Sequence, residues 1–137
     1  MRRRRRSDCP IHFALEAFGD PWTLLIVRDL TFKRRATYTD FLRAGEGIST
    51  NILANRLAKI EADGLALRDP TTGRYQLTEK GLALMPILLE MMVWSAAHDP
   101  QTAASPAFIA RIRADRDGLA AELSRPLQLP HATGADR

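Results

Sequence analysis

A single hairpin signal inside a helical pattern limits what this chain can fold into. The turn-forming run 69–73 (Asp-Pro-Thr-Thr-Gly) separates two short segments, 65–68 and 74–77, as a turn separates two strands. Elsewhere, apolar residues recur at the three- and four-residue spacing of helices. The sequence therefore predicts a mainly helical α+β domain with one two-stranded hairpin.

Helix-start and helix-stop signals set the expected helix boundaries. Proline after Cys9 and after Asp20 suits a first helical turn, and Ser49 can cap the helix that follows Gly45 and Gly47. The expected helices span residues 9–19, 20–35, 37–43, 49–63, 78–97 and 106–123. The basic run 33–35 would suit the negative end of the second helix dipole.

The composition is that of a folded globular protein. Hydrophobic residues make up 45% and charged residues 26%, which excludes a wholly disordered chain. We expect a disordered basic arm over 1–8, a folded domain over 9–98, a linker and C-terminal helix over 99–124, and a flexible tail over 125–137. The net charge of +4 favours a polyanionic partner, although the arginines at 2–6 carry part of it.

Cysteine usage and hydropathy favour a cytoplasmic location. Cys9 is the only cysteine, so an intramolecular disulfide and a cysteine-cluster zinc site are excluded. The first residues lack the apolar core of a signal peptide. The longest apolar stretch, 82–97, is interrupted by Pro86 and Glu90, and we expect it to be too short to cross a bilayer. No membrane partner is expected.

The order of the expected elements is the one that a winged helix-turn-helix requires. Two helices and a short third helix form a support, a glycine-containing turn leads into the helix 49–63, and the hairpin follows. In such a fold the helix 49–63 enters the major groove of duplex DNA, and the wing at 66–77 contacts the flanking backbone or minor groove. The sequence thus predicts a sequence-specific DNA-binding protein.

The helix 49–63 combines an apolar face with a polar face that suits base reading. We assign Ile52, Leu53, Leu57 and Ile60 to the core. Asparagine can pair with adenine, and arginine or lysine with guanine or phosphate. The candidate DNA contacts on this helix are Ser49, Thr50, Asn51, Asn55, Arg56 and Lys59. The helix alone leaves open the alternative of an ordinary solvated face.

Basic and hydroxyl residues outside that helix could hold the DNA backbone. The candidates are Thr72 and Arg74 in the hairpin, with Arg34 and Arg35 after the second helix. Taken singly, each exposed arginine is explained as well by solubility, so only their joint placement favours DNA. The arginines at 2–6 have two similar interpretations, a minor-groove arm or a solubilising tail.

Several motifs occur in a fixed order along residues 9–94. They are Cys9-Pro10, Gly-Asp-Pro-Trp-Thr at 19–23, Gly-Ile-Ser at 47–49, Glu-Ala-Asp-Gly-Leu at 61–65, Tyr-Gln-Leu-Thr-Glu-Lys-Gly at 75–81, Pro86 and Trp94. In this order they resemble the HxlR-type transcriptional regulators of the MarR-like superfamily. The resemblance implies a homodimer that reads an inverted repeat. Residues 19–22 depart from the family's usual double-glycine-lysine-tryptophan stretch but keep the helix start.

The second half of the chain has a local reason to associate. Residues 82–94 are apolar on nearly every face, so they need covering by more than one neighbour, such as a partner subunit and the first helix of each chain. The extension at 106–123 continues past the usual end of the family. It could complete the dimer interface or form the roof of a ligand cavity, and the sequence leaves both open.

Two routes of control are open at this point. The resemblance implies that Cys9 is a candidate redox sensor, because a helix N-terminus favours a reactive thiolate. The alternative is an inert packing cysteine. A small-molecule effector of unidentified chemistry is the other route. Its conceivable lining residues, Phe13, Trp22, Met85, Met92 and Trp94, are a set that usually forms core.

Other classes of protein fit less well. An enzyme is not expected, because His12, His98 and His131 are far apart and neither a nucleophile motif nor a glycine-rich phosphate loop is present. No cofactor or metal is expected. The stronger rival is a winged-helix module that binds proteins without operator DNA, because a fold does not fix a function.

Overall fold

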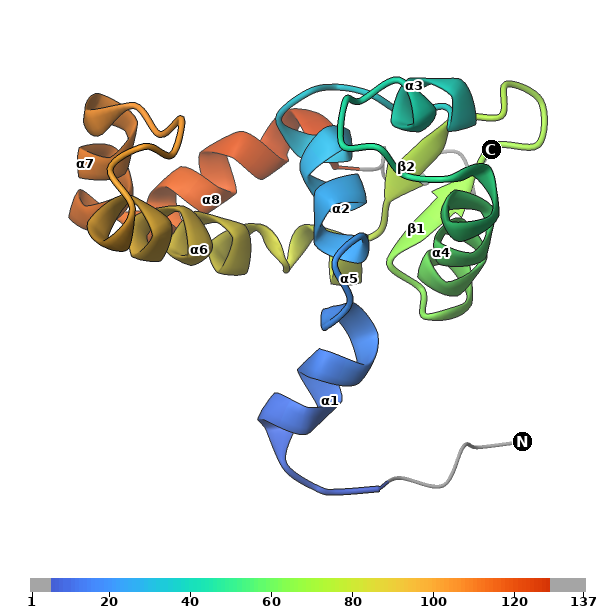
Figure 1. The fold of residues 1–137 in the computed structure, drawn as a ribbon, viewed down its shortest axis with the longest axis horizontal. Helices are drawn as coiled ribbons and strands as arrows, with labels where there is room; N and C mark the ends of the chain where they lie inside the picture. The colour runs from blue at the N-terminus through green and yellow to red at the C-terminus, as the bar shows by residue number, and fades with distance from the viewer. Residues whose placement is uncertain (1–5, 129–137) are drawn as a thin grey trace, which may run out of the picture.

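The computed structural model describes residues 6–128. It is a mainly helical winged helix with one antiparallel two-stranded sheet, which confirms the predicted fold class (Figure 1). In chain order the elements are α1 (Pro10–Phe18), α2 (Thr23–Thr31), α3 (Tyr38–Leu42), α4 (Thr50–Ala62), β1 (Ala66–Arg68), β2 (Tyr75–Leu77), α5 (Glu79–Leu82), α6 (Met85–His98), α7 (Pro106–Ala114), α8 (Arg116–Ser124) and the 3-10 helix η1 (Arg125–Leu127).

Two hydrophobic clusters hold the described residues together. The first lies among α2, α3, α4, the hairpin and the start of α6, with Val27 and Leu53 fully enclosed. The second lies among α6, α7 and α8, around Ile112. Leu88 belongs to the first cluster and the next residue, Leu89, to the second. Figure 1 shows α6 to α8 on one side of the molecule and α2, α4 and the hairpin on the other, joined through α5 and α6.

The hairpin is attached to the helices along one edge. Arg68 pairs with Tyr75 across the strands, and the Asp69 carboxylate accepts a hydrogen bond from the Thr71 N–H at 2.8 Å within the turn. The Tyr75 N–H donates to the Ala36 carbonyl at 2.7 Å. The segment before α3 therefore lies along the outer edge of β2, while the turn itself projects as a wing.

The cap predicted at α4 is present, and the structure adds a capping box at α3. Thr37 Oγ1 accepts from the Asp40 N–H, and the Asp40 carboxylate accepts from the Thr37 N–H, each at 3.1 Å. Ser49 Oγ accepts from the Ile52 N–H at 3.3 Å. These side chains satisfy backbone donors that the first helical turn leaves free. They fix the two helix starts close to where the sequence placed them.

The second helix is shorter than predicted. Asp20 caps it, accepting from the Trp22 and Thr23 N–H groups at 2.8 and 2.9 Å, but α2 begins at Thr23 and ends at Thr31. The basic run 33–35 lies in the following turn, where Arg34 has φ +54°. A residue with left-handed φ cannot continue a right-handed helix. The prediction that residues 33–35 lie in the last turn of the second helix is therefore wrong.

The predicted helix 78–97 is also wrong, because it is broken at residues 83–84. Pro86 has no N–H to donate and its ring crowds the carbonyl four residues back, so α5 ends at Leu82 and α6 starts at Met85. By length and mean hydropathy, 1.4, Glu79–His98 would be long enough to cross a membrane, contrary to the expectation from sequence. In the structure one side of α6 packs against α7 and α8, and the rest of the segment is largely exposed.

The predicted helix 106–123 is two helices, α7 and α8. Asp115 separates them with φ −160° and ψ 79°, and its carboxylate accepts from the Gly118 N–H at 3.0 Å. Asp115 thus ends one helix and caps the next. Leu127, expected in a flexible tail, lies in η1 and packs on the second cluster.

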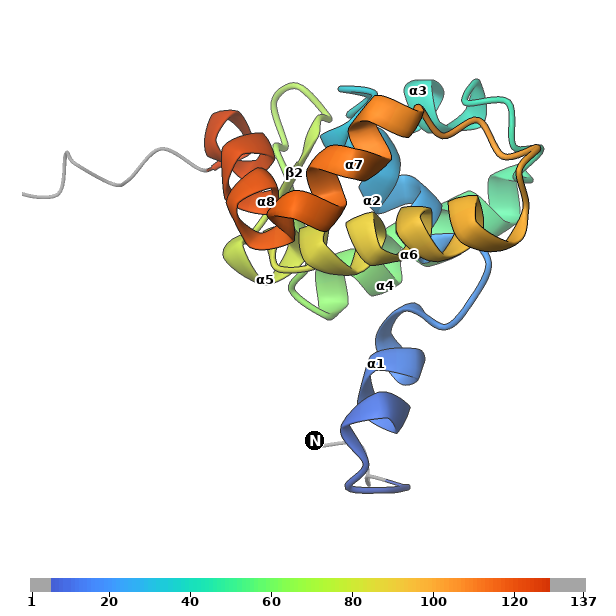
Figure 2. The same ribbon diagram turned by 90° about the vertical axis from the view of Figure 1, so that its left-hand side faces the viewer.

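Among the residues of the first helix, only Phe18 packs on a hydrophobic cluster, the first of the two. None of its residues is buried, and it projects from the rest of the molecule in two perpendicular views (Figures 1 and 2). The arginines at 2–5 and most of the expected tail, 129–137, lie outside the described residues.

Candidate nucleic-acid interface

The apolar face of helix α4 packs on the rest of the domain and holds the helix in place. Leu53, Leu57 and Ile60 are buried against the first cluster. The Tyr38 hydroxyl donates to the Thr50 carbonyl at 3.3 Å, which joins α3 to the start of α4. Ile52, which the sequence assigned to the core, is 38% exposed and lies at the edge of the outer face.

The outer face of α4 is open and polar in its first half. Ser49, Thr50, Asn51 and Asn55 are exposed, as are the small residues Ala54 and Ala58. Among residues 6–128, the Asn51 and Asn55 amides make no hydrogen bond. Small side chains beside free amides would let the helix approach the floor of a groove and pair with base edges.

Arg56 and Lys59, in the second half of α4, point to the junction between α1 and α2 instead. Arg56 Nε lies 3.4 Å from Asp20 Oδ1, in an ion pair. Lys59 Nζ donates to the Glu16 and Ala17 carbonyls at 2.9 and 3.1 Å. Both side chains are about one third exposed. These contacts could not be predicted from the sequence, because they depend on how α1 meets α4.

The same junction stabilises the ionised form of Asp20. Burial by itself would raise the pKa of Asp20, but hydrogen bonds from the Thr23 hydroxyl and from the Trp22 and Thr23 N–H groups outweigh it. The charge of Arg56 acts in the same direction. The net result is a pKa below the ordinary value for an aspartate.

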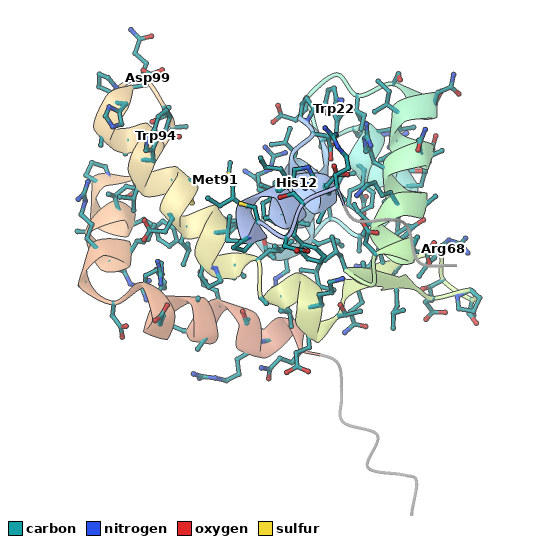
Figure 3. The ribbon with its side chains drawn as sticks, turned by 90° about the horizontal axis from the view of Figure 1, so that it is seen from below. His12, Trp22, Arg68, Met91, Trp94 and Asp99 are labelled. Atoms are coloured by element: carbon teal, nitrogen blue, oxygen red, sulfur yellow. The ribbon has the colours of Figure 1, made fainter. Side chains whose placement is uncertain are left out.

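Thr72 and Arg74 are exposed in the wing, as predicted, and the structure adds Arg68. The Arg74 N–H donates to Thr72 Oγ1 at 3.2 Å, which shapes the turn. Arg68, at the end of β1, is also exposed and lies beside Gly73 (Figure 3). Its position as the last residue of a strand that leads into the turn is the signal from which it could have been predicted.

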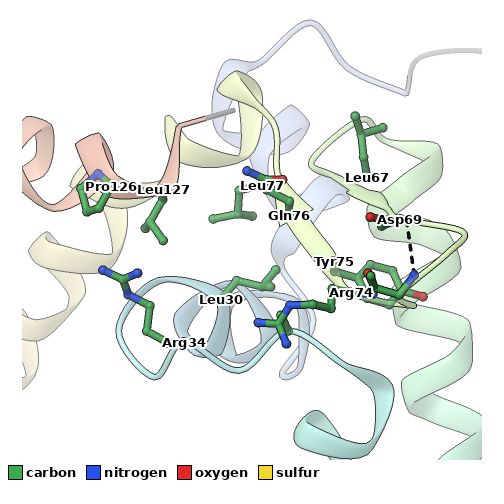
Figure 4. Close-up of a pocket in the computed structure, with 12 residues that line it drawn as sticks. Leu30, Arg34, Leu67, Asp69, Arg74, Tyr75, Gln76, Leu77, Pro126 and Leu127 are labelled. Atoms are coloured by element: carbon green, nitrogen blue, oxygen red, sulfur yellow. Dashed lines mark hydrogen bonds between the residues drawn. The ribbon is translucent and has the colours of Figure 1, made fainter. Parts of the chain in front are cut away.

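The two arginines after α2 differ in their surroundings. Arg35 Nη1 lies 3.6 Å from the buried Asp29 carboxylate, which Arg28 also contacts. Arg34 is exposed and faces a pocket beside β2 (Figure 4). The structure therefore places Thr72, Arg74 and Arg34 around the wing and uses Arg35 in an internal ion pair.

Cys9 is exposed at the N-cap position of α1, and Pro10 follows it in the first turn. Its backbone N–H donates to Ser7 Oγ at 3.1 Å. Within residues 6–128, no group of three or more histidine, cysteine or acidic side chains is arranged to hold a metal ion. Cys9 is thus accessible to solutes and lies at the end of a projecting helix.

A short helix, a turn, a helix with an open polar face and a hairpin wing define a winged helix-turn-helix DNA-binding protein. Residues 17–103 match the HxlR-like helix-turn-helix family, and the chain belongs to it. The chain is accordingly a DNA-binding transcriptional regulator, as the resemblance of its motifs predicted. That role is not an enzymatic one.

Relatives with known sequences support this assignment. The uncharacterised HTH-type transcriptional regulator YybR of Bacillus subtilis is 31% identical over 99 residues, which cover 68% of this chain and 78% of YybR. The uncharacterised HTH-type transcriptional regulator sll1512 of Synechocystis is 33% identical over 88 residues, 61% of this chain and 64% of that protein.

Solved structures share the fold. PA1607 has a TM-score of 0.63 at 31% identity, with 73% of each chain covered. Quinone-bound YodB from Bacillus subtilis has a TM-score of 0.57 at 29% identity, covering 65% of this chain and 98% of YodB.

Proposed function

We propose that this regulator acts in the cytoplasm as a homodimer on an inverted-repeat operator. Helix α4 of each protomer would enter the major groove, and the wing would contact the flanking backbone or minor groove. The observation that carries the proposal is the open face of α4, where the free Asn51 and Asn55 amides lie beside Ala54 and Ala58. Asparagine amides and close approach are what base reading requires.

The proposed contacts fall into two groups. Asn51 and Asn55 read bases, with Ser49 and Thr50 at the positive end of the helix dipole near a phosphate. Phosphates are held along the wing by Thr72, Arg74 and Arg68, and also by Arg34 in the turn after α2. We leave out three residues that the sequence suggested, because internal ion pairs or hydrogen bonds already use their charges: Arg35, Arg56 and Lys59.

The homodimer is supported by apolar side chains on two helices. On α1, Ile11 and Leu15 are 69% and 58% exposed, and on α6, Met91 and Trp94 are 48% and 67% exposed. Figure 3 shows Met91 and Trp94 on the side of α6 turned away from α7. The extension thus packs on a different side of α6, and we infer that a second copy of the chain covers these residues.

A salt-titrated gel shift tests the DNA proposal. DNA selected from a random-sequence duplex pool is bound by the reduced protein at increasing salt, and the mass of the free protein is measured by light scattering. We expect a dimer, and an affinity that falls linearly on a log–log plot by about 0.9 per phosphate contact. The absence of any complex at low salt would leave the protein-interaction module as the better description.

We propose in addition that Cys9 is the sensor of an electrophile. Two observations support this: Cys9 is exposed at the start of α1, and a structural neighbour was solved with a bound quinone. The thiolate sulfur would add to a ring carbon of the quinone, and the ring would take up a proton and rearrange to a hydroquinone, so no further oxidant is needed. Intact-protein mass spectrometry after treatment with benzoquinone tests this. One adduct is expected on the wild type and none on Cys9→Ser.

A further inference from the structure

A pocket of about 430 Å³ lies between the wing and the C-terminal extension. Its walls come from the whole hairpin with its turn, from the end of α2 and the turn after it, and from η1 (Figure 4). Pockets that bind small molecules are usually of this size or larger. The expected effector residues Phe13, Trp22, Met85, Met92 and Trp94 do not line it.

One side of the pocket is cationic. Arg34 and Arg74 both line it, on the same side of β2 in Figure 4, with Leu30 between them. Within residues 6–128, no carboxylate lies within ion-pair distance of either guanidinium. Asp69 also lines the pocket, but its carboxylate accepts hydrogen bonds from the wing turn, the shortest from the Thr71 N–H at 2.8 Å. Neither arginine is therefore in an ion pair with a described residue, although Arg74 interacts electrostatically with Asp40.

The opposite side of the pocket is apolar. Leu77 comes from β2 and Leu127 from η1, and Pro126 completes this wall. Leu127 also packs on the second hydrophobic cluster, so the wall is anchored to the fold. Because η1 lies beyond the family match at 17–103, Pro126 and Leu127 are parts of this wall that the matched region does not supply.

The backbone that presents Arg34 is held in place. Arg34 is the one non-glycine residue between 6 and 128 with a left-handed φ, +54°. On its C-terminal side the Arg35 N–H donates to the Asp29 carbonyl at 2.9 Å, and the Arg35 guanidinium pairs with the Asp29 carboxylate. The turn is therefore fixed independently of the Arg34 side chain, which leaves its guanidinium available to a ligand.

We propose that this pocket binds a small amphipathic organic anion, with a carboxylate between Arg34 and Arg74 and an apolar body against Leu77 and Leu127. A carboxylate is a planar acceptor whose two oxygens match the donor geometry of a guanidinium. The apolar wall selects against inorganic anions, which cannot bury carbon surface there. The two arginines in turn favour a charged compound over a neutral one with the same apolar body.

Calorimetric titration of the full-length protein without DNA tests the site. The probes are 2-naphthoate, its neutral analogue 2-naphthylmethanol, and inorganic phosphate. We expect naphthoate to bind at least about tenfold more tightly than either of the others. The alcohol lacks the charge that the arginines would bind, and phosphate lacks the apolar body that the leucines would cover. Equal binding of naphthoate and the alcohol, or of naphthoate and phosphate, would overturn the proposal, as would no binding at millimolar naphthoate.

Variants locate the binding. Arg34→Asn removes the charge with a residue that tolerates left-handed φ, and Gln76→Glu places a negative charge in the lining. Each should weaken naphthoate binding by about tenfold or more. Arg113→Asn, an exposed arginine on α7 outside the pocket, is the matched control and should leave the affinity within about twofold of wild type. If Arg34→Asn and Arg113→Asn behave alike, the ligand is bound elsewhere.

A link to DNA follows if the proposed function is right, because Arg34 and Arg74 are also proposed phosphate contacts. A gel shift on pool-selected DNA with and without saturating naphthoate is expected to show weaker DNA binding with the ligand. Failure to bind any DNA would contradict the proposed function and leave the calorimetric result intact. Unchanged DNA affinity with naphthoate bound would overturn the link and leave the pocket as a ligand site.

Discussion

The Lys59 ammonium on helix α4 donates a 2.9 Å hydrogen bond to the main-chain carbonyl of Glu16 in the last turn of α1. The same ammonium donates to the Ala17 carbonyl and pairs with Asp63 at 2.7 Å. A cation at the C-terminal end of a helix satisfies its free carbonyls and opposes the negative end of its dipole. Lys59 thus connects the proposed recognition helix to the proposed dimerisation helix.

Replacing Lys59 with methionine should loosen α1 while keeping the apolar stem. We expect a loss of about 1 kcal/mol in the free energy of unfolding, since the ammonium is partly solvated. We also expect faster amide hydrogen exchange over residues 13–18. Lys80→Met is the matched control, because Lys80 donates to the Asp63 carbonyl at 2.7 Å without touching α1. Equal exchange rates in α1 of the two variants would show that Lys59 does not hold that helix.

The base-reading role of Asn51 and Asn55 predicts a change in sequence preference. Replacing either with alanine should cost about 1 to 3 kcal/mol of binding to the selected operator and relax the preference at one base position. The dependence on salt should stay as in wild type, because no phosphate contact is lost. Repeating the selection with each variant measures the preference. An unchanged consensus in both would mean that this face of α4 is simply solvated.

Arg74 should behave in the opposite way. As a phosphate contact it carries no sequence information, so Arg74→Gln should weaken binding to all duplexes by a similar factor. The slope of log affinity against log salt should fall by about 1. Binding to the selected operator and to a scrambled duplex, each titrated with salt, measures both effects. A loss confined to the operator would make Arg74 a base contact.

The order of elements could be predicted from sequence because each boundary has a local cause. Ser49 and Thr37 cap their helices, and the turn-forming run 69–73 makes the wing. The expected long helices were wrong for reasons that were also local. Pro86 was visible at the break before α6, and Asp115 stands three residues before Gly118, where its side chain caps α8.

The site was harder to predict, because the roles of charged residues depend on contacts distant in sequence. Arg56 and Lys59 follow the exposed asparagines on the same helix, and only the packing of α1 shows that they face inward. Arg35 looks free in sequence, but it lies beside Asp29, which is buried. The pocket could not be foreseen either, because η1 and β2 are about 50 residues apart.

The low pKa of Asp20 predicts a loss of stability in acid. A carboxyl with a lower pKa in the folded state stabilises the fold above its unfolded pKa, near 3.8, and that contribution is lost as the pH falls through the folded pKa. Asp20→Asn removes this titration, whereas Asp40 and Asp69, whose pKa values are also lowered, still titrate. Chemical denaturation at about pH 6 and about pH 3 should show a smaller loss in the variant than in wild type. Equal losses would show that Asp20 does not contribute.

The proposed dimer predicts that a charge on the exposed side of α6 separates the protomers. Met91 is 48% exposed there. An aspartate at this position would be buried in the dimer without a partner, which would disfavour association by ~3 kcal/mol or more. Met91→Asp should therefore be a folded monomer by light scattering. It should also bind the inverted repeat with the weak affinity of a single half-site, because one protomer no longer positions the other.

Leu67→Asp makes a similar change at a leucine of β1 that is 54% exposed, and it should remain dimeric. Dimers in both variants would place the interface elsewhere than on α6, whereas monomers in both would show that added charge alone prevents association.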